Sequence, residues 1–392
     1  MGSSFSTPAQ QSRLSDVDVF RGGAALVVAA LHTREMMWVG IRETWQLNGG
    51  LRASPSAILG YLTYPLVWGS IGVPIFFVLS GYCIHRSQAF VRARARSFQL
   101  SNANFLLRRF VRIYPVFVGA LLFTLLCDSM SRHFAPDNPR LGETGIGAFL
   151  VNLFAIHGVI RKNFGSNGAL WTLSIEVQFY ALYPLLLTSM RRLGNLRTLL
   201  ALIALNIASY FALNRHGYEL FSSYYVSWYL GAMVAEGEAV GLPSRLLVLA
   251  RRRAELFGLS LAIMCCGCAL FFISHYGAFQ IWALAFAVFL FALLGRPAEF
   301  NGLAASFFRW TGTFSYSIYV VHLPLVVLVS SVFFNSAKQV NLAPFCATIV
   351  AVVGCAYAFS FVFERPALAL SQKLKQPIPP YAVPVAPLER FP

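Results

Sequence analysis

Long runs of apolar residues alternate with short polar segments along this chain of 392 residues. A run of about twenty apolar residues forms a helix long enough to cross the hydrocarbon core of a bilayer. The pattern therefore predicts an all-α polytopic membrane protein with about ten transmembrane helices. We expect these helices at residues 17–36, 60–85, 109–127, 168–190, 196–213, 221–240, 255–274, 278–295, 311–334 and 343–363.

The composition supports a membrane protein and argues against a nucleic-acid partner. Hydrophobic residues make up 57% of the chain and charged residues only 12%, whereas charged residues are about 25% of soluble domains. The net charge of +16 would suggest nucleic-acid binding in a soluble protein. In a membrane protein, Lys and Arg gathered in cytoplasmic loops account for it, and membrane lipids are the expected surroundings.

One short apolar stretch, residues 144–160, decides the topology, because counting it as a crossing would invert every helix after it. Beyond residue 165, thirteen Lys and Arg residues lie in one set of alternate loops, and only Arg215 and Lys338 lie in the other. The rich set is expected in the cytoplasm, as is the arginine-rich segment 86–112. Both halves agree only if 144–160 is a re-entrant or interfacial helix on the outer side, which leaves both termini cytoplasmic.

The membrane domain is expected to cover residues 17–366, between a polar N-terminal segment at 1–16 and a Pro-rich cytoplasmic tail at 367–392. Residues 376–392 of that tail are predicted to be extended or disordered. The seven cysteines lack the spacing of a zinc site. We therefore expect them to pack as small apolar residues, and we expect no metal.

Two ionisable residues, Arg21 and His32, lie inside the first apolar stretch. Ionisable side chains within a membrane are costly and usually functional. The eleven residues between them rise roughly 16 Å, about half a bilayer core, and make close to three turns, so both side chains point to about the same side. This arrangement suits a ligand with an anionic head near one membrane face and a reactive end buried deeper.

Two more arginines, Arg109 and Arg112, are spaced to share a face at the start of the third span. Such arginines often only flank a membrane helix, but Arg112 lies nearest the lipid core. With Arg21 it would clamp a phosphate, since guanidinium pairs bidentately with phosphate. The pair Gly22-Gly23 is expected to break the first helix where that phosphate would bind.

Glu176 lies about two turns into the span 168–190, at a depth that allows it to meet His32. A carboxylate beside an imidazole raises its basicity and fixes its tautomer, as a general base requires. We therefore predict that His32 and Glu176 are catalytic. The alternative is a buried ion pair that only joins two helices.

Two other groups of polar residues are candidates for lining one cavity together with Arg21, His32 and Glu176. Tyr316, Tyr319 and His322 follow at three-residue steps, so they form either a wall of the cavity or a hydrogen-bonded packing face. Ser80-Gly81, in the second span, indicates either a helix kink that lines a ligand site or a small-residue interface between two helices.

Six motifs follow one another through nearly the whole chain. They are Arg21-x10-His32, Phe76-Phe-Val-Leu-Ser80-Gly81, Arg109-Phe-Val-Arg112-Ile-Tyr-Pro115, Trp171-Thr-Leu-Ser-Ile-Glu176-Val-Gln-Phe179-Tyr180, Tyr316-Ser-Ile-Tyr319-Val-Val-His322-x-Pro324 and Glu364-Arg365-Pro366. In this order the chain resembles the acyltransferase-3 family of integral membrane O-acyltransferases. Each motif alone is weak, and their order makes the resemblance specific.

The resemblance implies that acetyl-CoA, or another acyl-CoA, donates its acyl group from the cytoplasmic side. The acceptor would be a hydroxyl of a glycan or lipid-linked saccharide at the bilayer or its outer face, in a bacterial cytoplasmic membrane. The resemblance marks Arg21 and His32 as essential and His32 as catalytic, and it adds Trp171 and Tyr180 to the cavity. The chain resembles the stand-alone form, without an appended periplasmic hydrolase-like domain.

The sequence leaves two mechanisms open. His32, oriented by Glu176, would either deprotonate the acceptor hydroxyl or first accept the acyl group itself. The main alternative function is a secondary transporter of an anionic solute that uses Arg21, His32 and Glu176 for binding and proton relay, although no convincing internal repeat supports it. A receptor or glycan-assembly scaffold would leave the buried charges unexplained.

Overall fold

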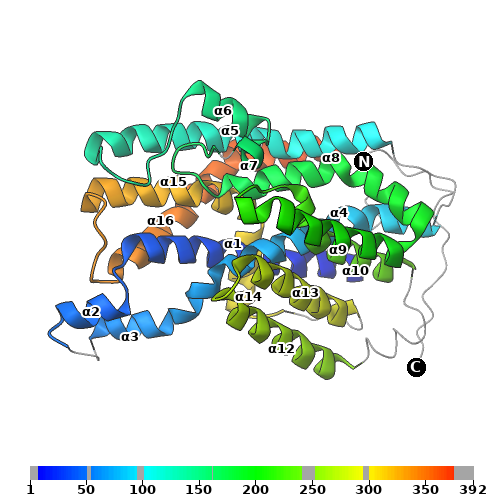
Figure 1. Cartoon of the computed structure of the whole chain (residues 1–392), viewed down its shortest axis with the longest axis horizontal. Coiled ribbons are helices and arrows are strands. Elements are labelled where there is room, and N and C mark those ends of the chain that lie inside the picture. The colour runs from blue at the N-terminus through cyan, green and yellow to red at the C-terminus, as the bar shows by residue number, and fades with distance from the viewer. Residues whose placement is uncertain are drawn as a thin grey trace.

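The structure, a computed structural model, describes residues 8–50, 54–94, 101–160, 162–240, 252–294 and 300–374. Within these ranges every regular element is a helix (Figure 1), and the single strand-like pairing is an isolated bridge between Trp38 and Gln339. The all-α class predicted from the apolar runs is confirmed.

Ten helices of 16 residues or more form the body of the described chain. They are α1 (Pro8–Met37), α4 (Gly72–Arg94), α5 (Asn102–Phe134), α8 (Leu170–Leu193), α9 (Asn195–Ala212), α10 (Tyr225–Val240), α12 (Arg253–Phe271), α13 (His275–Leu294), α15 (Ser315–Phe334) and α16 (Ala343–Phe359). Shorter elements connect them: α2 (Ile41–Leu47), α3 (Pro55–Leu62), η1 (Tyr64–Ile71), α6 (Ile146–Leu153), α7 (His157–Ile160), η2 (Asn214–His216), η3 (Phe221–Ser223), α14 (Leu303–Gly312), the π-helical turn η4 (Ser360–Glu364) and α17 (Arg365–Lys373).

Eight helical stretches of the described chain are long and apolar enough to cross a membrane, as expected of an integral membrane protein. They are Pro55–Val91, Asn102–Phe134, Leu170–Leu193, Asn195–His216, Arg253–Phe271, His275–Leu294, Ser315–Phe334 and Ala343–Lys373. These stretches coincide with eight of the ten predicted spans. The other two predicted spans fall in α1, whose apolar sequence is interrupted by ionisable residues, and in α10, which has only 16 residues.

The segment 144–160, predicted as one re-entrant or interfacial helix, forms two short helices, α6 and α7. The eight residues of α6 rise only about 12 Å, which is too short to cross a bilayer. The two helices lie over α5 and α8 (Figure 1). Ile146 and Phe154 remain 74% and 64% exposed. The expectation that this segment does not cross is consistent with its length.

The helix predicted at 311–334 begins later than expected, because the chain turns between α14 and α15. α14 packs closely against α1. A Cβ atom at Gly22 would overlap the carbonyl oxygen of Phe308, and one at Gly312 would overlap the carbonyl oxygen of Asp18. α1 is continuous from Pro8 to Met37, so the predicted break at Gly22-Gly23 is wrong. Gly22 instead permits the close crossing of two helices.

A second close crossing joins α4 to α10. A Cβ atom at Gly81 would overlap the carbonyl oxygen of Trp228, and one at Gly231 would overlap the carbonyl oxygen of Val78. Of the two interpretations of Ser80-Gly81, the small-residue interface is therefore confirmed. Ser80 on the same turn still contributes to a cavity, as described below.

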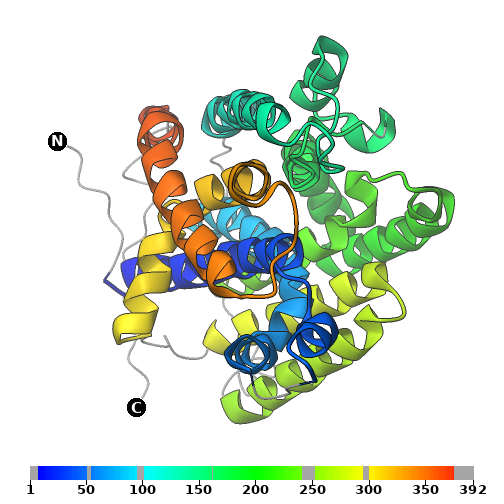
Figure 2. The same cartoon turned by 90° about the vertical axis from the view of Figure 1, so that its left-hand side faces the viewer.

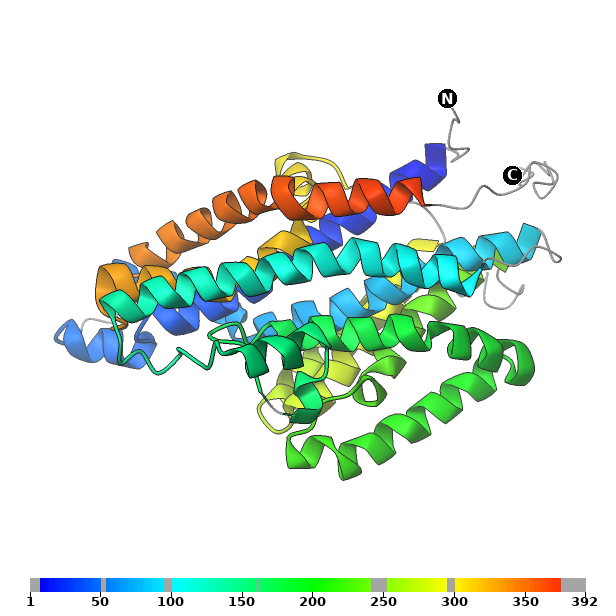
Figure 3. The ribbon, with the colours of Figure 1, turned by 90° about the horizontal axis from the view of Figure 1, so that it is seen from above.

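α1 runs through the middle of the bundle (Figure 2), where it contacts α4, α14, α15 and α16. Among the eight apolar stretches, α15 is the most buried. In Figure 3, α1 begins and α17 ends at the same end of the molecule. α17 shows that residues 365–373 are helical, whereas the Pro-rich stretch 376–392 lies outside the described residues.

Candidate functional site

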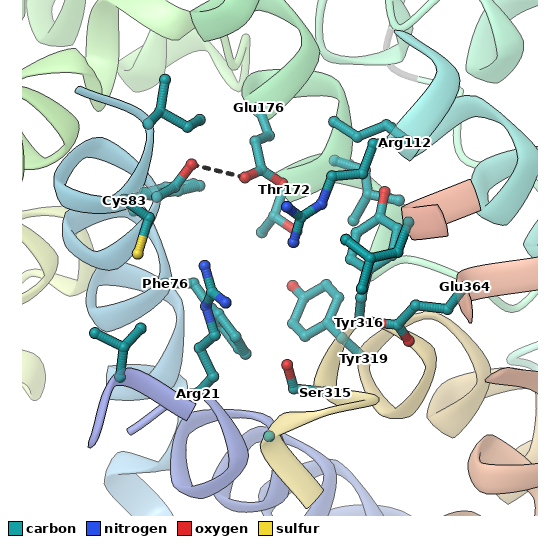
Figure 4. A pocket seen from close by; sticks show the side chains of 18 of the residues that line it. Arg21, Phe76, Cys83, Arg112, Thr172, Glu176, Ser315, Tyr316, Tyr319 and Glu364 are labelled. Carbon is teal, nitrogen blue, oxygen red and sulfur yellow. Dashed lines mark hydrogen bonds between the residues drawn. The ribbon is translucent and has the colours of Figure 1, made fainter. Parts of the chain in front are cut away.

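A cavity of about 500 Å³ lies between α1, α4, α5, α8, α15, η4 and α17 (Figure 4). Eight of the residues predicted from the sequence line it: Arg21, Ser80, Arg109, Arg112, Glu176, Tyr180, Tyr316 and Tyr319. They come from five helices, so the cavity exists only when the bundle is assembled. The ionisable residues singled out in separate spans therefore do converge.

Three arginines line this cavity, and among the described residues only Arg21 forms an ion pair with an acidic residue. Arg21 Nη1 lies 3.4 Å from Asp18 Oδ1. Arg109 lies over the ring of Tyr180, with 5.7 Å between the guanidinium carbon and the ring centre. Neither Arg109 nor Arg112 forms an ion pair with a carboxylate of the described residues. Both guanidinium groups are thus available to an anionic ligand.

Glu176 is held by hydroxyl groups and not by a histidine. Its Oε1 accepts hydrogen bonds from Ser80 Oγ, at 2.8 Å, and from the Tyr180 hydroxyl. Ser80 Oγ in turn accepts a hydrogen bond from Trp228 Nε1 at 3.3 Å. In the part of the chain that the structure describes, no bond joins Glu176 to His32, so the predicted pairing of these two residues is wrong.

The partner of His32 is a second histidine. His32 Nδ1 and His322 Nε2 are 2.9 Å apart, and the two rings are nearly parallel, with an interplanar angle of 10°. His322 is fully buried, whereas His32 is partly accessible. α1 and α15 therefore bring together two imidazoles that lie 290 residues apart in the sequence.

The other contact of His322 fixes which nitrogens carry protons. His322 Nδ1 lies 2.7 Å from the carbonyl oxygen of Tyr319, which only accepts hydrogen bonds, so Nδ1 of His322 is the protonated nitrogen. In a neutral ring, Nε2 of His322 then accepts, and Nδ1 of His32 donates to it. This leaves Nε2 of His32 with a free lone pair, as a general base requires.

The histidine pair lies just beyond the wall of the cavity. Tyr319, which lines the cavity, has its ring centre 5.7 Å from that of His322 and 5.7 Å from that of Phe76, another lining residue. His322, predicted as a lining residue, therefore lies behind Tyr319. The buried hydroxyl of Tyr316, also in the wall, has no hydrogen-bond partner among the described residues.

Trp171 is the other predicted cavity residue that the structure places elsewhere. It lies in the wall of a second, smaller pocket of about 260 Å³. Its ring contacts Phe77, with 6.3 Å between ring centres, and Phe77 lines the larger cavity. Trp171 thus stands between the two spaces.

Two carboxylates of the cavity were not assigned a role from the sequence. Asp18 lies three residues before Arg21, a spacing that predicts an ion pair on a helix. Glu364 accepts hydrogen bonds from the backbone nitrogen of Ser317, at 2.8 Å, and from its hydroxyl, at 2.5 Å. Glu364 stood in one of the six motifs, so the motif could have identified it. No three His, Cys, Asp or Glu side chains gather to hold a metal within the described ranges.

Comparison with known proteins places the whole bundle in one family. A family model described as an acyltransferase domain matches residues 14–361. Peptidoglycan O-acetyltransferase OatA of Listeria monocytogenes is 29% identical over 314 residues, which are 72% of this chain and 49% of that protein. The putative peptidoglycan O-acetyltransferase YrhL of Bacillus subtilis is 27% identical over 322 residues, 71% of this chain and 48% of that protein.

A shorter match covers part of the chain. O-acetyltransferase OatA of Staphylococcus aureus is 30% identical over 158 residues, 36% of this chain and 24% of that protein. The chain thus spans about half the length of the two relatives that it matches over most of its own length. No solved structure matches it significantly. The resemblance seen in the six motifs is confirmed.

Proposed function

This chain belongs to the family of that acyltransferase domain, and on this premise we propose that it is a membrane O-acyltransferase acting on a glycan. It would move an acyl group, most simply acetyl, from cytoplasmic acyl-CoA to a hydroxyl of a cell-surface or exported saccharide. The observation that carries the proposal is an arginine-lined cavity that lies next to a pair of histidines, His32 and His322, in which Nε2 of His32 has a free lone pair. The names of the relatives support acetyl transfer and a cell-wall glycan as acceptor.

The arginines suit the phosphates of the donor. Arg109 and Arg112 form no ion pair with a carboxylate of the described residues, and each guanidinium can bind a phosphate through two parallel hydrogen bonds. Arg21 faces the same cavity. Eleven residues further along α1, about 16 Å, lies His32. A donor held by its phosphates at the arginines would extend its acyl end toward the histidine pair.

The chemistry then belongs to His32. Its Nε2 would take the proton of an acceptor hydroxyl as the hydroxyl oxygen attacks the thioester carbonyl carbon. The carbon–sulfur bond breaks, and the same proton passes from His32 to the departing thiolate. His322 would hold the ring and stabilise the charge that it carries between these two transfers. Acylation of His32 before transfer to the acceptor uses the same free nitrogen.

The arginine end of the bundle would face the cytoplasm. α1 begins and α17 ends at that end (Figure 3), and the loops richest in Arg and Lys are predicted to share it. Acyl-CoA is then available where the arginines lie, and the histidines lie deeper, toward the outer face. The membrane would be the cytoplasmic membrane of a bacterium.

The test is acetyl transfer by membrane vesicles supplied with labelled acetyl-CoA. His32→Ala should lower the turnover number by roughly 100-fold or more, the usual size of a lost general base. Arg112→Ala should instead raise the KM for acetyl-CoA by roughly tenfold to a hundredfold, since a charge-assisted hydrogen bond is worth about 1.5–3 kcal/mol.

The matched control is Arg108→Ala on the same helix. Arg108 donates to the carbonyl oxygen of Ser371, at 3.2 Å, and does not line the cavity. Its loss should leave the KM for acetyl-CoA within about twofold, a difference worth less than a hydrogen bond. Full acetyl transfer by His32→Ala would overturn the proposal. Solute transport without acetyl-CoA consumption would restore the transporter, which the comparisons do not support.

A further inference from the structure

The smaller pocket, of about 260 Å³, lies between three segments that the sequence keeps apart. Its wall contains His157 of α7, Trp171 of α8 and Glu219 of the connection between η2 and η3. Pockets for whole small molecules measure about 300–1,000 Å³. This one is slightly smaller and suits a single ring of a larger molecule.

The pocket is firmly built. Gln178 of α8 donates to the carbonyl oxygen of Ala155, at 3.1 Å, and accepts from the backbone nitrogen of Phe221, at 2.9 Å. The backbone nitrogen of Glu219 donates to the carbonyl oxygen of Gly158 at 3.0 Å. These bonds tie the segment before α7 and the start of η3 to α8, and they tie α7 itself to the η2–η3 connection, so the backbone segments that form the pocket are held together.

Two side chains of this wall carry polar atoms that have no partner among the described residues. His157 is only 4% exposed. Its Nδ1 lies 2.8 Å from Ser174 Oγ, and its buried Nε2 has no hydrogen-bond partner among the described residues. Burial lowers the pKa of His157 to about 4, so the ring is neutral near pH 7. The Glu219 carboxylate forms no hydrogen bond or ion pair within the described chain, and burial raises its pKa.

The chemistry of the wall selects a neutral, hydroxyl-bearing ring. A hydroxyl both donates and accepts hydrogen bonds. It can therefore donate to the Glu219 carboxylate, and it can pair with His157 Nε2 whether or not that nitrogen carries the proton. The side-chain amide of Asn163, also in the wall, can do both as well. The ring of Trp171, also in the wall, provides an apolar surface for the C–H groups of such a sugar ring. No Arg or Lys of the described residues lines the pocket, so it does not suit the phosphates of a donor.

Contacts link the wall of the pocket to the larger cavity and to the helix that carries His322. Trp171 contacts Phe77, and its neighbour Thr172 lines the larger cavity. Asn167, next to the lining residue Gly168, donates to the carbonyl oxygen of Val320 at 2.9 Å. Val320 precedes His322 by two residues on α15. A ring bound in the pocket would thus lie beside the elements that carry the histidine pair.

We propose that the pocket formed by His157, Trp171 and Glu219 binds one sugar ring of the acceptor saccharide. The inference rests on the proposed acyltransferase function and names the part of the chain that recognises its acceptor. The acceptor then enters from the side of α7 and the η2–η3 connection, separately from the donor at the arginines.

Binding is measured first, without acetyl-CoA. The probe is a tritium-labelled glycan fraction extracted from the envelope of a strain that lacks this protein, and the protein is the full chain in lipid nanodiscs. Glu219→Gln should weaken binding by about tenfold, because an amide oxygen accepts a hydrogen bond more weakly than a carboxylate does. Trp171→Phe should weaken it by about as much, because the ring loses part of its apolar surface. The control variant is Arg215→Gln, because Arg215 is an exposed residue of η2 outside the pocket. This variant should bind the glycan as tightly as the original chain does.

Acetyl transfer to the same glycan fraction is measured in parallel. Glu219→Gln should raise the KM for the glycan about tenfold and leave the KM for acetyl-CoA unchanged. Equal glycan binding by Glu219→Gln and the original chain, or a raised KM for acetyl-CoA alone, would overturn the acceptor pocket. Glycan binding by the original chain without any acetyl transfer would overturn the proposed function and leave the pocket standing. Absence of binding would overturn the pocket whatever the transfer shows.

Discussion

At the scale of single residues, the central feature is the relay from the Tyr319 carbonyl through His322 to His32. In the proposed mechanism these two imidazoles would do what a carboxylate and an imidazole do in many hydrolases, since the contacts fix one tautomer and leave one nitrogen basic. The cation formed on His32 would be stabilised by a polarisable neutral ring and not by a negative charge.

This relay predicts different outcomes for His322 and Glu176. His322→Phe should lower the turnover number for acetyl transfer about 100-fold with little change in the KM for acetyl-CoA, because His32 loses the group that fixes its tautomer. His322→Gln should recover part of the activity, since an amide can donate at one atom and accept at another. The pH profile of the turnover number should change with His322→Phe, which a purely structural role would not cause.

Glu176→Gln is the comparison variant. The amide oxygen can still accept from Ser80 and Tyr180, which are the contacts that Glu176 makes, so the turnover number should fall less than about tenfold. A larger loss in Glu176→Gln than in His322→Phe would return Glu176 to the role of orienting group.

Most residues of the candidate site could be predicted from the sequence, because an ionisable residue inside an apolar span is energetically costly and can be recognised in a single sequence. That argument selected Arg21, His32, Arg112 and Glu176, and all except His32 line the cavity. The pairing of His32 with Glu176 was wrong for a physical reason. Depth along a helix follows from residue number, but the direction that each helix faces depends on how neighbouring helices pack.

At the scale of helices, the long apolar runs predicted most elements, whereas breaks within a run escaped prediction. The turn between α14 and α15 lies in sequence that reads as helix, and α6 and α7 divide a stretch that reads as one. Such breaks are decided by tertiary contacts. The close crossing of α1 and α14 at Gly22 and Gly312 is one such contact, and the local sequence pattern does not predict it.

The α4–α10 crossing predicts a contrast between two glycines in helices. Gly231→Ala should lower the thermal unfolding temperature of the detergent-solubilised protein by several degrees, because its Cβ would overlap the Val78 carbonyl oxygen and overpacking costs about 1–3 kcal/mol. In α12, a Cβ at Gly258 meets nothing within 4 Å. Gly258→Ala should therefore leave that temperature unchanged or raise it, because Ala favours helix. Equal shifts for both variants would mean that the crossing does not limit packing.

At the scale of the whole molecule, the proposed function depends on the orientation of the bundle in the membrane, since a cytoplasmic donor would reach the arginines only if they lie on the cytoplasmic side. Lys338, between α15 and α16, and Lys373, near the end of α17, lie on opposite sides in the predicted topology. Single cysteines at these positions, in a chain freed of its seven native cysteines, can be labelled in intact spheroplasts with a membrane-impermeant maleimide.

Lys338→Cys should label in intact spheroplasts, and Lys373→Cys only after the membrane is permeabilised. The reason is electrostatic: the segments rich in Arg and Lys stay in the cytoplasm, and Lys373 belongs to one of them while Lys338 does not. The reverse pattern would place Arg21, Arg109 and Arg112 at the outer face, away from acyl-CoA. Acetyl-CoA is then supplied to one face of membrane vesicles of known orientation, and acetyl transfer is measured. This experiment tests whether the donor enters from the side that the labelling identifies as cytoplasmic. Agreement of both measurements would make the path from the arginines to His32 a path directed outward.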